Sequence, residues 1–220
     1  MQERTKTSLR IAVAQSTVRT DPTDASLLRQ SGLEVRRLMK DAADAGARLV
    51  HLTEGAICSP DKRVMSELGS AQIGASNWSK AQWNVLQEEL DLIAALSGNL
   101  GIWTVIPSVH RLPAPSRPYN STYVVSDKGA IVARYDERML STTKITWMYA
   151  PGTQPVTFEV DGYRFGLALG LDVLFPELFT QYDQFGVDAV LVSYASSGSG
   201  KEVVPIHVRG HAVTNTYWVC

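Results

Sequence analysis

Acidic side chains follow two segments of the 220-residue chain that are predicted to be strands. Glu54 comes directly after the segment 48–53, RLVHLT, and Asp172 comes after the run 165–171, FGLALGL. The apolar run 165–171 is typical of a strand that is buried on both faces. A carboxylate at the end of such a strand is costly unless it has a partner or a chemical role. We therefore expect any active site to lie beside Gly170 and these two carboxylates, where α/β folds place their ligands.

Other reactive residues have simpler interpretations. Cys58 lies four residues after Glu54, but no base partner can be identified for it, so a buried loop thiol is favoured. His207 and His211 could share a metal on a helix, yet no third ligand has suitable spacing, so a surface or interface pair is favoured. The loop 196–200, SSGSG, lacks the pattern of a nucleophile elbow or a P-loop and is expected to be a flexible connection.

The elements that position these residues alternate along the chain. Pro176 suits the first turn of a helix that follows the 165–171 run. Helices are predicted over 22–46, 79–98, 175–185 and 203–214. Strands are predicted over 9–16, 48–53, 102–110, 119–126, 130–135, 156–160, 164–171, 189–194 and 217–220. The first helix is expected to bury Leu28, Val35, Leu38, Ala42 and Ala45. This order predicts a layered α/β protein with two sheets and helices outside them.

Composition excludes several classes of protein. Hydrophobic residues make up 45% and charged residues 20% of the chain, as in a globular domain, and the net charge of −1 gives no case for nucleic acid or an anionic membrane. No apolar stretch approaches the ~20 residues of a membrane span. Two cysteines, Cys58 and Cys220, do not make a disulfide framework. We expect a cytoplasmic protein with a disordered tail over 1–8 and a single domain over 9–220.

Six segments together resemble the nitrilase-type carbon–nitrogen hydrolases, also called the amidase/nitrilase superfamily. They cover nearly all of the chain from residue 9 onward, and the FPEL turn with the downstream GVDAVLVSYAS strand is the most specific part. The segments are 11–15, 49–56, 119–140, 149–152, 158–196 and 207–219. The resemblance implies a four-layer αββα sandwich and no metal or organic cofactor. The family continues beyond the Tyr-Trp-Val segment, so we expect this chain to lack the C-terminal strand and tail.

The resemblance also implies an active site with a Glu–Lys–Cys triad. In this triad the Glu is the general base, the Lys stabilises the oxyanion, and the Cys forms a thioester with the acyl group. By resemblance the base falls on Glu54, which this chain retains. The lysine of the family's Tyr-x-Lys pattern falls on Glu137, which follows Tyr135-Asp136. The cysteine falls on Gly170, two residues before Asp172. Glycine cannot form a thioester, and Glu137 brings a negative charge where an oxyanion needs a positive one.

A second exchange accompanies these substitutions. Many family members carry a further glutamate in a Thr-Glu-Ile segment, and the corresponding stretch here is Thr143-Lys144-Ile145. Our hypothesis is that Lys144 pairs with Glu54 or Glu137; the alternative is an ordinary exposed loop lysine. We also expect Asp172 and Tyr194 to contribute to binding.

Three functions are consistent with this pattern. The first is a protein that has lost thiol hydrolysis and acts as a structural or regulatory subunit or binds a small amide-, nitrile- or carboxylate-like ligand. The second is an active hydrolase of a small amide or nitrile, in which Gly170 is an engineered or unusual change. The third is acid–base chemistry by Glu54 and Glu137 without a covalent intermediate. In each case we expect a homodimer or a larger homo-oligomer that associates through the FPE helix and the 203–214 helix.

Overall fold

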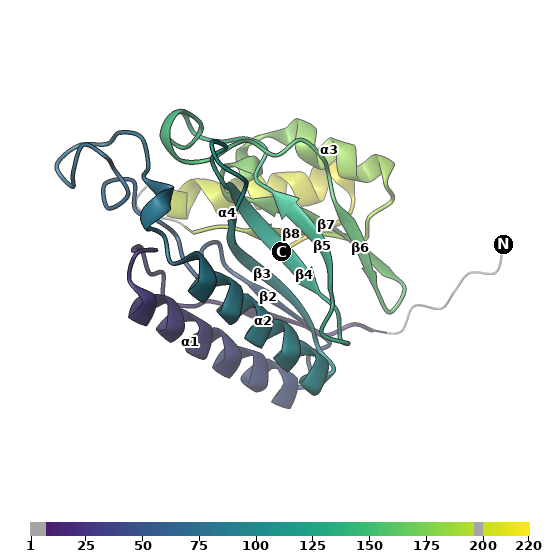
Figure 1. Ribbon diagram of the computed structural model, residues 1–220. Helices are drawn as coiled ribbons and strands as arrows, with labels where there is room; N and C mark the ends of the chain where they lie inside the picture. The colour runs from purple at the N-terminus through teal and green to yellow at the C-terminus, as the bar shows by residue number, and fades with distance from the viewer. Residues whose placement is uncertain (1–7, 196–199) are drawn as a thin grey trace.

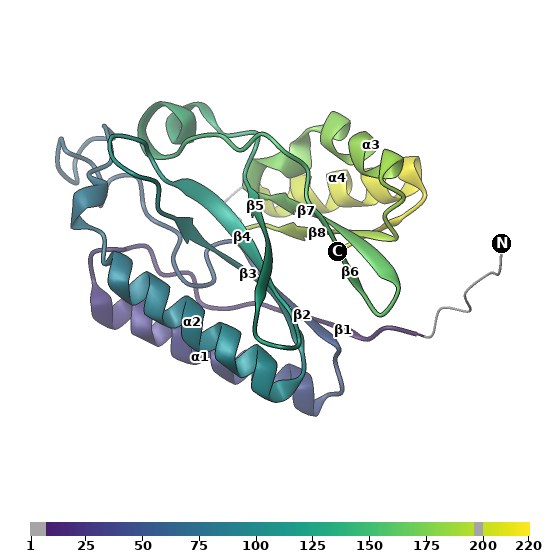
Figure 2. The same ribbon diagram turned by 45° about the vertical axis from the view of Figure 1, so that its right-hand side comes forward.

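Two β-sheets lie face to face, with a pair of helices on each outer face (Figures 1 and 2). The computed structural model describes residues 8–195 and 200–220. The predicted tail over 1–8 and the predicted connection over 196–200 therefore lie almost wholly outside the described residues. The four-layer αββα sandwich expected from the sequence is confirmed.

The first sheet has five strands in the order β1-β2-β3-β4-β5. The strands β1, β2 and β3 are parallel, and β3, β4 and β5 are antiparallel. Their bounds are β1 Ile11–Ala14, β2 Leu49–Leu52, β3 Trp103–His110, β4 Tyr119–Val125 and β5 Ile131–Asp136. The predicted hairpin of β4 and β5 is confirmed. All four residues of β2 are buried, including His51, whose Nε2 is hydrogen-bonded to the Ser193 hydroxyl at 2.9 Å.

The second sheet has four strands in the order β6-β7-β8-β9. The strands β6 and β7 form the predicted antiparallel hairpin, and β7, β8 and β9 are parallel. Their bounds are β6 Thr157–Val160, β7 Tyr163–Leu169, β8 Ala189–Ser193 and β9 Trp218–Val219. The parallel strands of the two sheets bring their carboxyl ends to a common region of the molecule, and this arrangement builds the site described below.

The helices α1 (Ala25–Asp44) and α2 (Trp83–Leu100) cover the first sheet. Asp24 caps α1, since its carboxylate accepts hydrogen bonds from the N–H groups of Ser26 and Leu27 at 2.8 and 3.2 Å. The expectation that Ala45 is buried is wrong: the helix ends before this residue, which is exposed at its C-cap. The predicted helix over 79–98 is a 3₁₀ turn, Trp78–Lys80, followed by α2.

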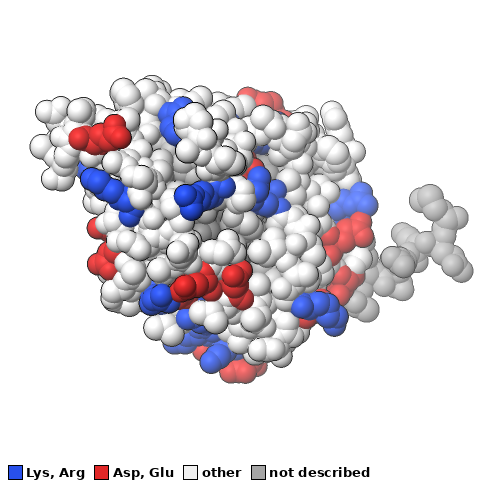
Figure 3. Space-filling view, viewed as in Figure 1, with Lys and Arg blue, Asp and Glu red and all other residues white. Residues whose placement is uncertain are grey.

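The helices α3 (Pro176–Gln184) and α4 (Gly200–Asn215) cover the second sheet. Pro176 occupies the first turn of α3 as predicted. A separate apolar cluster, which includes Leu49, Val105 and Leu167, lies between the two sheets and fixes their separation. Acidic and basic side chains are interspersed on the face shown in Figure 3. Over the described residues, no helix is long and apolar enough to cross a bilayer.

Candidate functional site

A cavity of about 1010 Å³ lies at the carboxyl ends of the parallel strands. Glu54 follows β2, Gly170 follows β7, and Tyr194 with Ala195 follows β8; all four line the cavity. The irregular segment after β5 adds Lys144, the first residue of a π-helical turn, Lys144–Met148. Four elements that are distant in sequence therefore meet at one site, and they do so at the sheet edge where α/β folds bind ligands.

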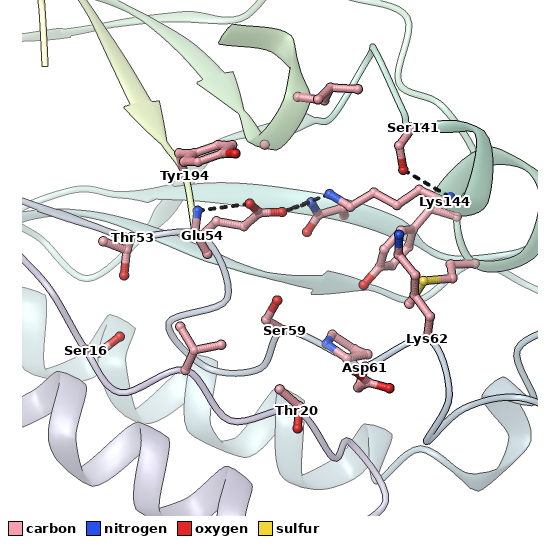
Figure 4. Close-up of a pocket in the computed structure, with 18 of the residues that line it drawn as sticks. Ser16, Thr20, Thr53, Glu54, Ser59, Asp61, Lys62, Ser141, Lys144 and Tyr194 are labelled. Atoms are coloured by element: carbon pink, nitrogen blue, oxygen red, sulfur yellow. Dashed lines mark hydrogen bonds and ion pairs between the residues drawn. The ribbon is translucent and has the colours of Figure 1, made fainter. Parts of the chain in front are cut away.

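Lys144 bridges two carboxylates at this site: Glu54, which lines the cavity, and Glu137, which lies behind the lining. Figure 4 shows Lys144 and Glu54 in the lining. The Nζ of Lys144 lies 2.9 Å from Oε1 of Glu54 and 2.7 Å from Oε2 of Glu137. The predicted pairing of Lys144 is thus present, and it involves both carboxylates instead of one. Because Glu137 is only 1% exposed, the ammonium group supplies a charge partner that this buried carboxylate requires.

Asn120, on β4, joins the same cluster and was not anticipated from the sequence. Its Nδ2 donates to Oε1 of Glu54 at 2.9 Å and to Oε2 of Glu137 at 2.7 Å. The backbone N–H of Ala195 donates to the other oxygen of Glu54 at 3.1 Å. An amide at the second position of the strand 119–125 was the available signal, because an amide that is buried in a strand needs partners.

Glu137 and Gly170 are packed against each other so closely that a side chain at residue 170 would require Glu137 to shift. A Cβ built on Gly170 would lie 2.8 Å from the carboxyl carbon of Glu137 and 3.1 Å from Oε1 of Glu54. The backbone of Gly170 also has φ +57°, a left-handed conformation that side chains disfavour. The next residue, Leu171, donates its N–H to Oε1 of Glu137 at 2.9 Å. The carboxylate of Glu137 therefore fills the space in which a side chain of residue 170 would lie, and it accepts the hydrogen bond of the Leu171 N–H.

Burial and mutual charge determine the protonation of this cluster. Burial, together with the neighbouring charge of Glu54, raises the pKa of Glu137 to about 7, although Lys144 opposes the shift. Burial lowers the pKa of Lys144, but the two carboxylates outweigh it and hold the pKa of the ammonium above its usual range. At neutral pH the cluster thus consists of a fixed cation and two carboxylates, one of which exchanges a proton near neutrality.

Comparison with known proteins shows the family to which the chain belongs. The model of the family described as carbon-nitrogen hydrolase matches residues 10–220. The chain belongs to the carbon–nitrogen hydrolase family. Two hydrolases of Mycobacterium tuberculosis, from strains CDC 1551 / Oshkosh and ATCC 25618 / H37Rv, are each 28% identical to it over 201 residues. The match includes 87% of this chain, and the chain spans 62% of the length of these relatives.

Solved structures of an amidase share the fold of this carbon–nitrogen hydrolase family member. The amidase from Nesterenkonia sp. superposes with a TM-score of 0.77 at 20% identity, over 96% of this chain and 74% of that chain. A mutant of the amidase from Nesterenkonia sp. AN1 in complex with butyramide gives a TM-score of 0.74 at 23% identity, with the same coverage of 96% and 74%. Another mutant of that amidase shows acrylamide added at its active-site cysteine, with a TM-score of 0.78 at 20% identity over 96% of this chain and 77% of that one.

Asp172 and Tyr194, the two remaining predicted site residues of this family member, are placed differently. Tyr194 lines the cavity together with Glu54 (Figure 4). Asp172 is fully buried behind the cavity, where its carboxylate accepts hydrogen bonds from the Tyr135 hydroxyl at 2.6 Å and the Met139 N–H at 2.8 Å. It also accepts from the N–H groups of Arg138 and Leu169. Asp172 therefore ties the 3₁₀ turn Gly170–Leu174 to the end of β5 and is not in the cavity lining.

The other candidate nucleophile and the histidine pair lie away from this centre. Cys58 is buried outside the cavity lining, and burial raises the pKa of its thiol to about 12. His211 is hydrogen-bonded to the carbonyl of Val173 at 2.8 Å and stacks on Phe179 with ring centroids 3.8 Å apart. Within the described ranges, no group of three or more potential ligands could hold a metal ion. Neither cysteine of the chain, Cys58 or Cys220, is among the residues that line the cavity.

Proposed function

We propose that this member of the carbon–nitrogen hydrolase family has lost thioester hydrolysis and uses its cavity to bind a small amide-, nitrile- or carboxylate-like molecule. The observation that carries the proposal is the contact between Glu137 and Gly170. Residue 170 has no side chain, and the carboxylate of Glu137 takes the volume in which a nucleophile would stand. A thioester cannot form at a residue without a side chain.

The oxyanion step is blocked by the same carboxylate. In acyl transfer, a backbone N–H after the nucleophile and a nearby cation stabilise the negative oxygen of the tetrahedral intermediate. Here the N–H of Leu171 is bonded to Glu137, and Lys144 is held between two carboxylates. The amidase of known structure has an active-site cysteine, whereas the two cysteines of this chain, Cys58 and Cys220, do not line the cavity.

The size of the cavity and the polar groups that line it support the proposal that it binds a ligand. The cavity is large enough for a small organic molecule and is lined mainly by polar residues and tyrosines. Every charged group of the Lys144 cluster has a hydrogen-bonding partner, as Glu54 and Lys144 illustrate. A polar pocket with satisfied charges persists as a binding site without turnover.

A reconstruction experiment tests the proposal. The unmodified protein and the triple variant Gly170→Cys, Glu137→Lys, Lys144→Glu are assayed for ammonia release from acetamide, butyramide and butyronitrile, and ligand binding to the unmodified protein is followed by calorimetry. The three changes are made together because Gly170→Cys alone would collide with Glu137. We expect no turnover by the unmodified protein and measurable turnover by the variant. Turnover by the unmodified protein would refute the loss of hydrolysis.

We further propose that the protein forms a homodimer or larger homo-oligomer through α3 and α4. The outer surface of α4 exposes Val203, Ile206 and Val213, and Phe185 is exposed at the end of α3. Apolar side chains that gather on one helix face favour association. Light scattering should give at least twice the monomer mass, and Ile206→Glu should reduce it. A monomer at micromolar concentration would contradict this proposal.

A further inference from the structure

We propose that the cavity selects a small zwitterion, an ω-amino acid whose ammonium group binds at Glu54 and whose carboxylate binds at Lys62. The inference rests on the proposed function, because it requires a cavity that binds without hydrolysing. It adds the class of ligand and the orientation in which the ligand lies. Three separate features support it: the charge of the cluster of Glu54, Glu137 and Lys144, a lysine near the opening of the cavity and unsatisfied hydroxyl groups in its lining.

The cluster of Glu54, Glu137 and Lys144 has an excess of one negative charge when both carboxylates are ionised, as they are for the most part at pH 8. Glu54 and Glu137 contribute two carboxylates, and Lys144 contributes the single cation that contacts them. Their other contacts within the described residues are uncharged: the amide of Asn120 and the backbone N–H groups of Leu171 and Ala195. An uncompensated charge in a buried site favours a ligand of opposite sign over a neutral one.

Glu54 offers the position for this ligand cation. One of its oxygens is shared by Lys144 and Asn120, but the other accepts only the Ala195 N–H among the described residues. A carboxylate oxygen can accept a second hydrogen bond. Tyr194 also lines the cavity, and ammonium ions bind favourably beside aromatic rings. A protonated amine therefore finds a charge partner at Glu54, in a lining that also contains an aromatic ring.

Lys62 supplies the opposite charge on another wall. It lines the cavity, and none of its interactions within the described part of the chain is an ion pair. Its neighbour Asp61 instead accepts hydrogen bonds from the backbone N–H groups of Arg63 and Val64. Figure 4 shows the Lys62 side chain rising from its loop toward Lys144. Lys62 can therefore pair with a ligand carboxylate inside the cavity.

Two hydroxyl groups in the cavity lining have no hydrogen-bond partner among the described residues. Ser16 is 5% exposed, and neither its Oγ nor the Oγ1 of Thr53 has a hydrogen-bond partner. Both residues line the cavity, at the end formed by the strands β1 and β2 (Figure 4). Buried hydroxyls without partners are rare in folded proteins, and a polar ligand resolves the deficit. The lining is therefore suited to a ligand with several hydrogen-bonding groups.

These features rank simple ligands by charge. An ω-amino acid satisfies both ends, an alkylamine satisfies only the cluster at Glu54, and a neutral amide gains neither ion contact. An alkyl carboxylate gains Lys62 but has no group that compensates the charge of that cluster. The distance between the ammonium group and the carboxylate of the ligand depends on its chain length. The ligand series compared is therefore β-alanine, 4-aminobutyrate and 6-aminohexanoate.

Titration calorimetry at pH 8 tests the ranking. The probes are the three ω-amino acids, butylamine, butyrate and butyramide, measured with the unmodified protein and with Lys62→Met. We expect the best ω-amino acid to bind at least tenfold more tightly than butylamine, and butylamine more tightly than butyramide or butyrate. Lys62→Met should abolish the advantage of the ω-amino acid and leave butylamine binding unchanged or stronger. Lys80→Met, which changes an exposed lysine outside the cavity lining, is the matched control and should change neither value.

The outcomes separate this inference from the proposed function. Tightest binding by butyramide or butyrate without turnover would overturn the zwitterion while leaving the binding function intact. An advantage of the ω-amino acid that survives Lys62→Met would overturn the assigned orientation. Hydrolysis of butyramide, or no binding by any of the six probes, would refute the proposed function together with the inference.

Discussion

Glu137 and Gly170 are complementary in shape: the carboxyl carbon of one lies 2.8 Å from the position that a Cβ on the other would occupy. The hydrogen bond from the Leu171 N–H, which lies beside Gly170, holds that carboxylate in place at 2.9 Å. The two residues therefore depend on each other. A side chain at residue 170 would displace Glu137, and displacing Glu137 would disturb Lys144, to which it is paired at 2.7 Å.

Gly170→Ala tests this dependence through stability. We expect the free energy of unfolding to fall by about 3 kcal/mol, because a left-handed backbone costs roughly 1–2 kcal/mol and overpacking roughly 1–3 kcal/mol more. Urea denaturation measures the loss. The control is Gly162→Ala, since Gly162 has φ +85° but nothing within 4 Å of the added Cβ, so that only the backbone cost applies. Equal losses at the two glycines would contradict the packing of Glu137 against residue 170.

Removing the cation of the cluster should be severe. Lys144→Met leaves Glu54 and Glu137 facing each other without a counter-charge, and breaking a buried ion pair in this way costs roughly 3–5 kcal/mol. Thermal or urea unfolding at pH 8 measures the effect. Lys128→Met, at a lysine side chain that is 84% exposed, should change stability by less than about 0.5 kcal/mol. If Lys144→Met were as mild as that control, the buried pairing would be wrong.

Stability should also fall as the pH rises toward neutrality. The pKa of Glu137, which faces Lys144 and Glu54, is raised by burial from 4.5 to about 7. Between these values the folded protein holds a proton that the unfolded chain releases, so stability is fully present below about pH 4.5 and is lost up to pH 7. Since one pKa unit is about 1.4 kcal/mol, this group accounts for about 3 kcal/mol.

The variant Glu137→Gln isolates that contribution. It keeps the shape of the side chain and cannot ionise, so the unfolding free energy of the variant should decline less between pH 5 and pH 7.5 than that of the unmodified protein. The difference between the two profiles is measured by urea denaturation at matched pH values. Parallel profiles would show that residue 137 does not titrate in this range.

Cys58 should be inert toward thiol reagents. A pKa of about 12 leaves a thiolate fraction near 10⁻⁴ at pH 8, and the side chain is buried. In a Cys220→Ser variant, which leaves Cys58 as the single thiol, native protein should resist iodoacetamide and urea-unfolded protein should react fully. Rapid labelling of the native variant would revive Cys58 as a candidate nucleophile.

The strand pattern predicted most of the fold because buried strands and capped helices have local signatures. Glu54 and Gly170 both line the cavity, and each follows a buried strand that could be predicted from the sequence. The pairing of Lys144 could be anticipated from the exchange of charges along the chain. The position of Asp172 in the sequence indicated the end of the strand before it. Its burial behind the cavity could not be predicted, because it depends on contacts with Tyr135 and Met139, which are far from it in sequence.

The finer geometry depended on contacts between distant elements. Asn120 carries no charge and lies within a buried strand, so its two bonds to the carboxylates had no local signal beyond the cost of burying an amide. The bond from the Leu171 N–H to Glu137 joins a backbone group to a residue 34 positions away. The spacing of apolar residues along the chain does not predict such a contact. The exposure of Ala45 shows the same limit at a smaller scale, because the end of a helix shifts the burial of its last residue.

Ammonia release from butyramide by the unmodified protein tests the central claim most directly. The account predicts a rate no greater than that of a heat-denatured sample, and intact-protein mass spectrometry after incubation should show no added acyl group. These results follow from a site in which Glu137 fills the space above a glycine. Sustained ammonia release that scales with protein concentration, or a protein mass increased by one acyl group, would contradict the account.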